Sequence, residues 1–470
     1  MLDRIYQALP NRQLVIIGLV FLHLSLAIVY FISDSITGNG FDESVIYFLH
    51  TGVDGLETSG YRYLMVSTAF LILLCLYVCI KLGRSRYLNH SGNAIKVLGV
   101  NVALGTLLFF QPAFNVLATQ PLYDFVTGTS GSIELKIPGD IEIPRKKNIV
   151  YLYLESFERS FLDETQFPGL APNLRELEKQ GLAFTNIDTA YGARWTIAGM
   201  VASQCGLPLQ SVSDANKPGT FMPEAICLGD TLKQNEYVTS YLGGASLRFG
   251  GKGNFYKTHQ FDSVQGLEHH KRALSLETTA LSEWGLYDED LYPLAWQEIT
   301  RLQTRHEPFA LFLLTLDTHP PSGFPSSDCD DVRYGDGKNA MLNTLHCSDR
   351  LAANFIRRLL ASEAAAETII VVASDHLVMA NGASEQLRQH PQRRNLFFIL
   401  EQNRRRQSIE RHASPFDIAP TLLSVLGAEI EDYNFGVSLL GNNNTLMERI
   451  NKPNEALRLW SGNKPGGSIY

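Results

Sequence analysis

The chain has 470 residues, of which 45% are hydrophobic and 19% are charged, so it is long enough for several domains and too apolar to be disordered. Its formal net charge of −8 provides no basic field that would hold nucleic acid, and the short run of arginines at 404–406 is typical of a solvated surface turn. Composition therefore argues against a nucleic-acid partner.

Two apolar stretches near the N-terminus are predicted to cross a lipid bilayer. Residues 14–32 and residues 64–80 carry no formal charge, and each is close to the length that spans a hydrocarbon core. The first stretch is too long for the apolar part of a signal peptide, and no clear cleavage site follows it. Cys75 and Cys79 lie in the second stretch as ordinary apolar residues.

Residues 97–118 form a third candidate span. Asn101, Gln111 and Pro112 lie within it, so an amphipathic helix on the membrane surface is the alternative. With this third helix included, we predict a membrane domain over residues 1–118.

The charges that flank these stretches predict their orientation. Basic residues precede the first stretch and follow the second, whereas residues 33–61 between them contain several acids and no Lys or Arg. The N-terminus is therefore expected in the cytoplasm. Three spans would then place everything after about residue 119 in the periplasm, outside the inner membrane.

The exported part contains the other four cysteines. An even number of cysteines in an oxidising compartment predicts disulfides, and four buried thiols are the alternative. The simplest pairing joins neighbours along the chain, although the sequence leaves the pairing open: Cys205 with Cys227, and Cys329 with Cys347.

The exported part is predicted to form one large α/β domain over residues 148–445. A connector rich in Gly, Ser, Pro and charge precedes it at 119–147, and a C-terminal tail follows at 446–470. Four continuous apolar runs predict strands that helices cover on both faces: 148–154, 309–316, 367–374 and 395–400.

The sequence also indicates where two helices between or after these strands begin and end. Pro172 opens one helix and Gly181 ends it, while Ser414 and Pro415 open another that Gly427 ends. Alternation of strands and helices predicts a mainly parallel sheet. Ligands of such sheets bind at the carboxyl ends of the strands, so the residues at those ends are the first candidates for function.

Two predicted strands end in residues that can bind a metal ion. Glu155 follows one strand, and Asp375 with His376 follows another. Two carboxylates and an imidazole suit a divalent cation such as Zn²⁺ or Mn²⁺. Each residue also has a purely structural alternative: a turn cap, a helix cap and a hydrogen-bonded loop histidine, respectively.

Thr196 is the fourth candidate ligand, because it opens a helical run of small residues. At a helix N-terminus its oxygen would feel the positive end of the helix dipole, and an adjacent metal would favour its deprotonation to a nucleophile. The structural alternative is an ordinary threonine N-cap.

The chain resembles the membrane-anchored phosphoglycerol and phosphoethanolamine transferases of the alkaline phosphatase and sulfatase superfamily. The resemblance extends from about residue 30 to about residue 430 and includes the predicted outer loop FISDSITGNGFDESVIYFL. It continues in order through six further stretches: YLESFERSF, WTIAGMVASQCGLPL, ICLGDTLK, LRFGGKGNFYKTHQFD, TLDTHPP and VVASDHLVM. It implies an α/β/α catalytic domain of the alkaline phosphatase type.

The resemblance also implies the roles of particular residues. The metal ligands would be Glu155, Thr196, Asp375 and His376, with one Mn²⁺, Mg²⁺ or Zn²⁺ ion bound. Thr196 would be the catalytic nucleophile that becomes phosphoglycerylated, and His319 would be a second catalytic residue on the substrate side.

Substrate-binding residues are expected in the LRFGGKGNFYK stretch. Related lipoteichoic acid synthases have an aromatic residue and an arginine there for the phosphoglycerol group, and the nearest candidates in this chain are Arg248, Phe249 and Lys252. The chain departs from the family at Arg194, where the resemblance leads us to expect an acid. It is also shorter than the longest members, so we expect no second C-terminal periplasmic region.

These implications lead to one main hypothesis and two alternatives. The main hypothesis is an inner-membrane transferase that moves phosphoglycerol from phosphatidylglycerol to a periplasmic glucan through a threonine-linked intermediate. The first alternative uses the same site for phosphoethanolamine transfer or for polyglycerolphosphate synthesis. The second is a non-catalytic membrane receptor, which the joint presence of all the metal ligands argues against.

Overall fold

The computed structural model describes residues 12–52, 61–84, 94–119, 135–209, 219–274, 281–389, 392–430 and 432–462. The chain divides into two compact units. The smaller unit comprises Met1–Val45 and Thr58–Thr129, and the larger comprises Ile46–Glu57 and Ser130–Tyr470. The short segment at 46–57, which we placed in the membrane domain, therefore groups with the larger unit.

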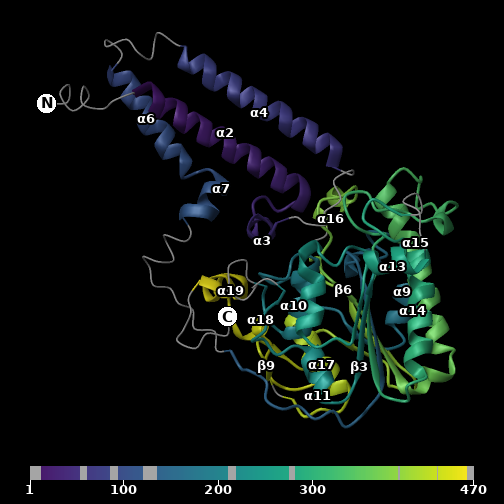
Figure 1. The fold of residues 1–470 in the computed structure, drawn as a ribbon. Helices are drawn as coiled ribbons and strands as arrows, with labels where there is room; N and C mark the ends of the chain where they lie inside the picture. Colours follow the sequence, from purple (N-terminus) through teal and green to yellow (C-terminus); the bar gives the residue numbers. More distant parts are fainter. Residues whose placement is uncertain are drawn as a thin grey trace. The chain divides into compact units, whose positions relative to one another are not determined.

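The smaller unit is built from long apolar helices. Helix α2 (Arg12–Thr37) and helix α4 (Arg62–Gly83) are each long and apolar enough to cross a membrane, and they contain the first two predicted spans. Helix α2 packs against both α4 and α6 (Ala94–Leu108) (Figure 1). Across the α2–α6 contact, Nε2 of His23 lies 2.9 Å from the carbonyl oxygen of Leu104.

The third predicted span, residues 97–118, is not one helix. Helix α6 ends at Leu108, and two short pieces follow it: α7 (Pro112–Phe114) and the π-helical turn η3 (Asn115–Thr119). Pro112 interrupts the helix because its nitrogen carries no hydrogen for the helical ladder. The apolar part of α6, Leu98–Leu108, is too short to cross a bilayer alone. Among the described residues the structure thus offers two candidate spans rather than three.

The larger unit is organised around an eight-stranded sheet in the order β4-β3-β5-β1-β6-β7-β2-β8. Strands β4, β3, β5, β1 and β6 are parallel, while β7 runs antiparallel to both of its neighbours. The strand bounds are β1 Asn148–Leu154, β2 Leu182–Phe184, β3 Val238–Gly243, β4 Ser263–Gln265, β5 Phe309–Leu314, β6 Thr368–Ser374, β7 Phe397–Glu401 and β8 Gln407–Ile409. The predicted mainly parallel α/β sheet is confirmed.

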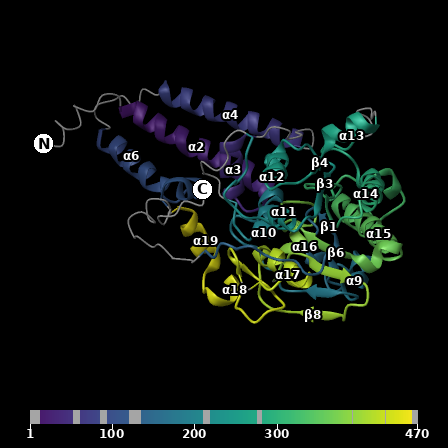
Figure 2. The ribbon, with the colours of Figure 1, turned by 60° about the horizontal axis from the view of Figure 1, so that its bottom comes forward.

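Helices cover both faces of this sheet, which explains why its central strands are apolar throughout. Along β1, Ile149, Tyr151 and Tyr153 join one core, and the alternate residues join the other. Figures 1 and 2 show α10, α11 and α17 on one side of the strands and α14 and α15 on the other. Their bounds are α10 Thr196–Cys205, α11 Leu228–Gln234, α14 Asp288–Gln303, α15 Ala340–Leu360 and α17 Ile418–Val425.

Shorter elements complete the larger unit. The other α-helices with residues in this unit, of which α3 begins in the smaller unit, are α3 Glu43–Thr51, α9 Pro172–Glu178, α12 Lys252–Thr258, α13 Leu267–Leu274, α16 Ser384–Arg388, α18 Leu446–Arg449 and α19 Pro453–Gly462. A separate pair of two-residue strands is formed by β9 (Asp432–Tyr433) and β10 (Gly436–Val437). Helix α9 begins at Pro172 and α17 ends just before Gly427, as their sequence signals predicted.

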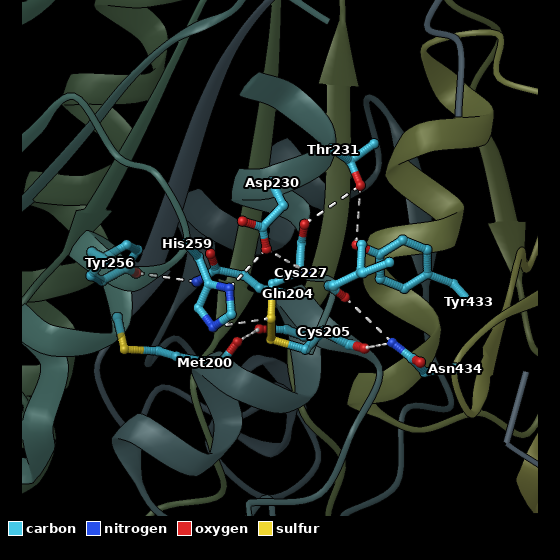
Figure 3. The surroundings of a disulfide bond; sticks show 12 residues. Met200, Gln204, Cys205, Cys227, Asp230, Thr231, Tyr256, His259, Tyr433 and Asn434 are labelled. Atoms are coloured by element: carbon cyan, nitrogen blue, oxygen red, sulfur yellow. Dashed lines mark hydrogen bonds and ion pairs between the residues drawn. A yellow bond between two sulfur atoms is a disulfide. The ribbon is translucent and has the colours of Figure 1, made fainter. Parts of the chain in front are cut away.

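Both disulfides join cysteines that are neighbours along the chain, Cys205 to Cys227 and Cys329 to Cys347. The first links the C-terminus of α10 to the N-terminus of α11, beside the buried side chain of His259 (Figure 3). His259 Nδ1 lies 2.8 Å from Asp230 Oδ2, which fixes the ring against α11. The disulfide therefore anchors the far end of the helix that Thr196 begins.

Candidate functional site

The ends of two adjacent parallel strands bring Glu155, Asp375 and His376 together. Leu154 of β1 pairs with Ser374 of β6, so the residues that follow them leave the sheet side by side. All three side chains are buried, and one ligand atom from each lies within 4.8 Å of the others. His376 Nε2 is 3.3 Å from Asp375 Oδ2 and 3.6 Å from Glu155 Oε1. The convergence expected from the sequence is present.

Thr196 lies at the same point, although it belongs to a helix rather than to a strand end. Its Oγ1 is 3.5 Å from Glu155 Oε2 and 3.4 Å from His376 Nε2. Trp195, in an extended conformation, occupies the N-cap position of α10, so Thr196 is the first helical residue and not the cap. The Thr196 hydroxyl therefore faces the acidic cluster at the positive end of the helix dipole.

The three titratable groups perturb one another. Burial acts to raise the pKa of Glu155, but the hydrogen bond of His376 and the charges of His319 and His376 outweigh it and lower that pKa to about 2. Burial and the charge of Glu155 raise the pKa of Asp375 to about 7. Burial acts to lower the pKa of His376, but the charges of Asp375 and Glu155 raise it to about 9. The cluster thus attracts positive charge strongly.

This donor set fits a divalent cation. Asp375 Oδ2 is buried and accepts no hydrogen bond from the described residues, and the partner that lies near it is Nε2 of His376 at 3.3 Å, itself a candidate ligand. Two carboxylates, an imidazole nitrogen and a hydroxyl oxygen are suitable ligands for Zn²⁺ or Mn²⁺. Glu155, Thr196, Asp375 and His376 would therefore hold the ion.

Ser156 orients both carboxylates, and sequence analysis did not identify it. Its backbone N–H donates to Asp375 Oδ1 at 2.8 Å, and its hydroxyl donates to Glu155 Oε1 at 2.9 Å. Its φ of 55° lies in the left-handed region, which a serine adopts only where its surroundings compensate for the strain. Nothing in the sequence YLESF distinguishes this serine from an ordinary turn residue.

Gly199 allows α10 to approach the loop after β6 that carries Asp375 and His376. A Cβ built on Gly199 would lie 1.8 Å from the carbonyl oxygen of Asp375, so any larger residue would push the helix away. The glycine one turn after Thr196 was a usable sequence signal, because a glycine inside a helix often marks a close backbone approach.

His319 interacts electrostatically with Glu155, and its role on the substrate side stays a prediction. Its Nδ1 is 2.8 Å from the carbonyl oxygen of Pro320, which places the proton on Nδ1 and leaves Nε2 free to accept another. Burial lowers the pKa of His319, so the ring is neutral near pH 7. Trp284, which the sequence analysis missed, covers the ring, with centroids 3.9 Å apart.

The three predicted substrate-binding residues separate into two groups. Lys252 is buried, and its ammonium lies 5.0 Å from the centre of the Phe249 ring. Burial lowers the pKa of Lys252 to about 8, although Glu155 and Asp375 oppose that effect. The side chain of Arg248 is 74% exposed instead, and it lies 3.9 Å from Glu268. Lys252 thus interacts electrostatically with the cluster and packs on Phe249, and Arg248 does not join them.

Two family models match the chain. The Sulfatase model matches residues 147–428, which contain every predicted site residue. A second model, described as Phosphoglycerol transferase I, N-terminal domain, matches residues 4–123. The first match lies within the larger unit, and the second spans most of the smaller unit together with residues 46–57.

Curated relatives match most of the chain. Proteins named phosphoglycerol transferase I from Xanthomonas campestris pv. campestris and from Salmonella typhi are 34% and 35% identical to it, over 90% and 87% of its length. The chain spans 61% and 54% of the length of these two relatives.

Solved structures share the fold of the larger unit. A Vibrio parahaemolyticus protein of the alkaline phosphatase superfamily aligns with a TM-score of 0.54 at 24% identity, covering 71% of this chain and 81% of the other. The lipoteichoic acid synthase LtaP from Listeria monocytogenes aligns with a TM-score of 0.51 at 18% identity, covering 67% and 81%. At these identities the likeness concerns the fold alone.

Proposed function

This chain belongs to the sulfatase family, and on that basis we propose that it transfers a phosphoglycerol group from phosphatidylglycerol to a periplasmic glucan. The observation that carries the proposal is the position of Thr196. Its hydroxyl lies within 3.5 Å of two candidate metal ligands, at the N-terminus of a buried helix. The names of the curated relatives support phosphoglycerol as the transferred group.

The bound cation would neutralise charge on the phosphate and favour ionisation of the Thr196 hydroxyl. In the first step Thr196 Oγ1 loses its proton and forms a bond to phosphorus, while the bond from phosphorus to the diacylglycerol oxygen breaks. The diacylglycerol oxygen gains a proton as it leaves. The phosphoglycerol group remains on Thr196 as a phosphodiester.

The second step returns Thr196 to its starting state. A sugar hydroxyl attacks the same phosphorus, and the bond from phosphorus to Thr196 Oγ1 breaks. His319 suits the role of general base here, because its free Nε2 and lowered pKa leave it ready to accept the proton of that hydroxyl. Thr196 Oγ1 regains a proton as it leaves.

The surroundings of Lys252 favour glycerol phosphate over phosphoethanolamine. Its ammonium makes no hydrogen bond with any residue that the structure describes, so a phosphate oxygen would be a suitable partner. The ammonium of an ethanolamine group would instead be repelled by a buried cation at the same place.

A membrane location outside the cytoplasm suits this chemistry. Helices α2 and α4 would hold the catalytic unit near a lipid donor and raise its effective concentration. The two disulfides of the larger unit favour an oxidising compartment such as the periplasm.

The test uses the full chain in detergent with Mn²⁺ and a glucan acceptor. Phosphatidylglycerol labelled in its head group should transfer label to the glucan, and Thr196→Ala should abolish the transfer. The matched control Thr304→Ala changes an exposed threonine at the end of α14 and should leave transfer unchanged. Transfer from labelled phosphatidylethanolamine alone would replace the proposal with the phosphoethanolamine alternative.

A further inference from the structure

A series of four aromatic rings leads from α3 to His319 within the larger unit. Phe48 of α3 stacks on Phe249, with centroids 5.3 Å apart and an interplanar angle of 11°. Phe249 meets Trp284 at 5.4 Å, edge to face, and Trp284 covers His319 at 3.9 Å. Three of these rings lie far along the chain from α3, which comes from the segment between the two candidate membrane helices.

Tyr47, the residue before Phe48, contacts the turn that follows Phe249. Its hydroxyl donates a hydrogen bond of 3.1 Å to the carbonyl oxygen of Gly250. Its ring packs 5.6 Å from that of Trp195, the residue immediately before Thr196. Tyr47 thus contacts both the turn that precedes Lys252 and the residue that precedes Thr196.

The turn that Tyr47 contacts needs such support. Gly250 and Gly251 both have positive φ, 67° and 77°, and as glycines they have many backbone conformations available, so ordering this turn costs conformational entropy that contacts must offset. Lys252 follows directly as the first residue of α12. The position of the Lys252 ammonium therefore depends on contacts that fix this glycine pair.

We propose that α3 completes the donor site, with Tyr47 and Phe48 as positioning residues that hold the Phe249–Gly251 turn, and through it Lys252, against the phosphoglycerol group. This proposal rests on the proposed function. It assigns to the N-terminal third of the chain a part in substrate binding in addition to membrane anchoring.

Partial exposure leaves Phe48 and Phe249 accessible to a ligand at the edge of the hydrophobic core. Phe48 and Phe249 are neither fully buried nor fully exposed, whereas the neighbouring Tyr47 and Trp195 are buried. Phe48 packs against the core without being enclosed by it. Rings that remain partly open beside a buried lysine can instead border a ligand with a polar phosphate and an apolar glycerol backbone.

The test compares Phe48→Ala with Leu49→Ala in the full-length protein. Leu49 is the next residue of α3 and its side chain is 68% exposed, so it serves as the matched control. Loss of the stacking partner should raise KM for phosphatidylglycerol about three- to tenfold, with kcat changed by less than about twofold. Phe48→Tyr should restore KM because it keeps the ring, and Tyr47→Phe should raise KM through the lost hydrogen bond to Gly250.

A second readout does not depend on transfer. The Kd of glycerol 1-phosphate, followed by calorimetry in the presence of Mn²⁺, should rise in Phe48→Ala by the same factor as KM.

If wild type transfers phosphoglycerol but Phe48→Ala matches Leu49→Ala in both readouts, the role of α3 is refuted and the proposed function stands. If wild type transfers nothing yet Kd depends on Phe48, the proposed function fails and the role of α3 stands. A fall in kcat alone, or a wild type that binds no glycerol phosphate, also overturns the role of α3.

Discussion

Ser156 is not a candidate metal ligand, but it orients the carboxylates of two candidate ligands. Its hydroxyl holds Glu155 and its backbone N–H holds Asp375. Ser156→Ala removes only the first of these bonds, so Glu155 gains freedom to rotate. We expect Mn²⁺ affinity to fall about tenfold, measured by titration of the metal-free protein. Ser408→Ala, an exposed change in β8, is the control, and equal affinities for the two variants would show that the Ser156 hydroxyl is dispensable.

Asp417 gives stability a pH dependence of its own. It is buried beside α17, accepts N–H groups from Ser414 and Val437, and has a pKa that burial raises to about 6. Between about pH 4 and pH 6, the Asp417 carboxyl is protonated in the folded protein and ionised in the unfolded chain. The contribution of this proton to the free energy of unfolding has its full value below about pH 4, and it is lost as the pH rises through about 6.

The measurement is the free energy of unfolding of the full chain in detergent from pH 4 to 7. Asp417→Asn should flatten the decline with rising pH by up to about 1.4 kcal/mol per pH unit relative to wild type. Asp331→Asn, at an exposed position, should keep the wild-type slope. Parallel curves for wild type and Asp417→Asn would contradict this account of Asp417.

Residue-level prediction from the sequence succeeded where a strand end signals the position. Glu155, Asp375 and His376 directly follow apolar strands, so the topology of a parallel sheet was enough to expect them together. Ser156, Trp284 and Phe48 could not be found in this way, because their roles depend on a strained turn or on ring contacts between distant segments. Arg248 and Lys252 lie four residues apart, and only the structure shows that one is exposed and the other buried.

Among the elements, α10 depends on its contact with the loop after β6. Gly199 lets the helix lie against the backbone of Asp375, and a methyl group there would collide with that carbonyl oxygen. Gly199→Ala should shift Thr196 away from the cluster and lower transfer about a hundredfold. Gly139→Ala is the control, since a Cβ at Gly139 meets nothing within 4 Å. Wild-type transfer by Gly199→Ala would show that the contact is not needed.

Element prediction succeeded for four continuous apolar strands, but it missed the buried six-residue strand β3 and the short strands. The strands β1, β5, β6 and β7 are continuous apolar runs and were predicted. Strands β2, β4 and β8 have three residues each, too few for a hydrophobic pattern to identify. The third span was predicted from composition across Pro112, where the helix is interrupted.

At the scale of the whole molecule, the side of the membrane on which the larger unit lies stays a prediction. Two candidate spans alone would return the chain to the side of its N-terminus, so export requires a third crossing, which α6 is too short to make alone and which α7 and η3 would have to complete. The disulfides favour export. We expect Asp336→Cys, at an exposed position of the larger unit, to react with a membrane-impermeant maleimide in cells whose outer membrane has been made permeable.

The matched control for that labelling is Ser85→Cys, which follows the second predicted span and is expected in the cytoplasm. It should react only after the inner membrane is lysed. Reaction of Asp336→Cys under the same condition alone would place the catalytic unit in the cytoplasm and exclude a periplasmic acceptor.

The most direct test of the whole account is the mass of the peptide that contains Thr196 after brief incubation of the full chain with phosphatidylglycerol and Mn²⁺ in the absence of an acceptor. We predict a phosphoglycerol adduct on Thr196 that disappears when a glucan acceptor is added and that does not form in Asp375→Asn. Transfer to the glucan at the wild-type rate with no adduct on Thr196, or with Thr196→Ala fully active, would contradict the account.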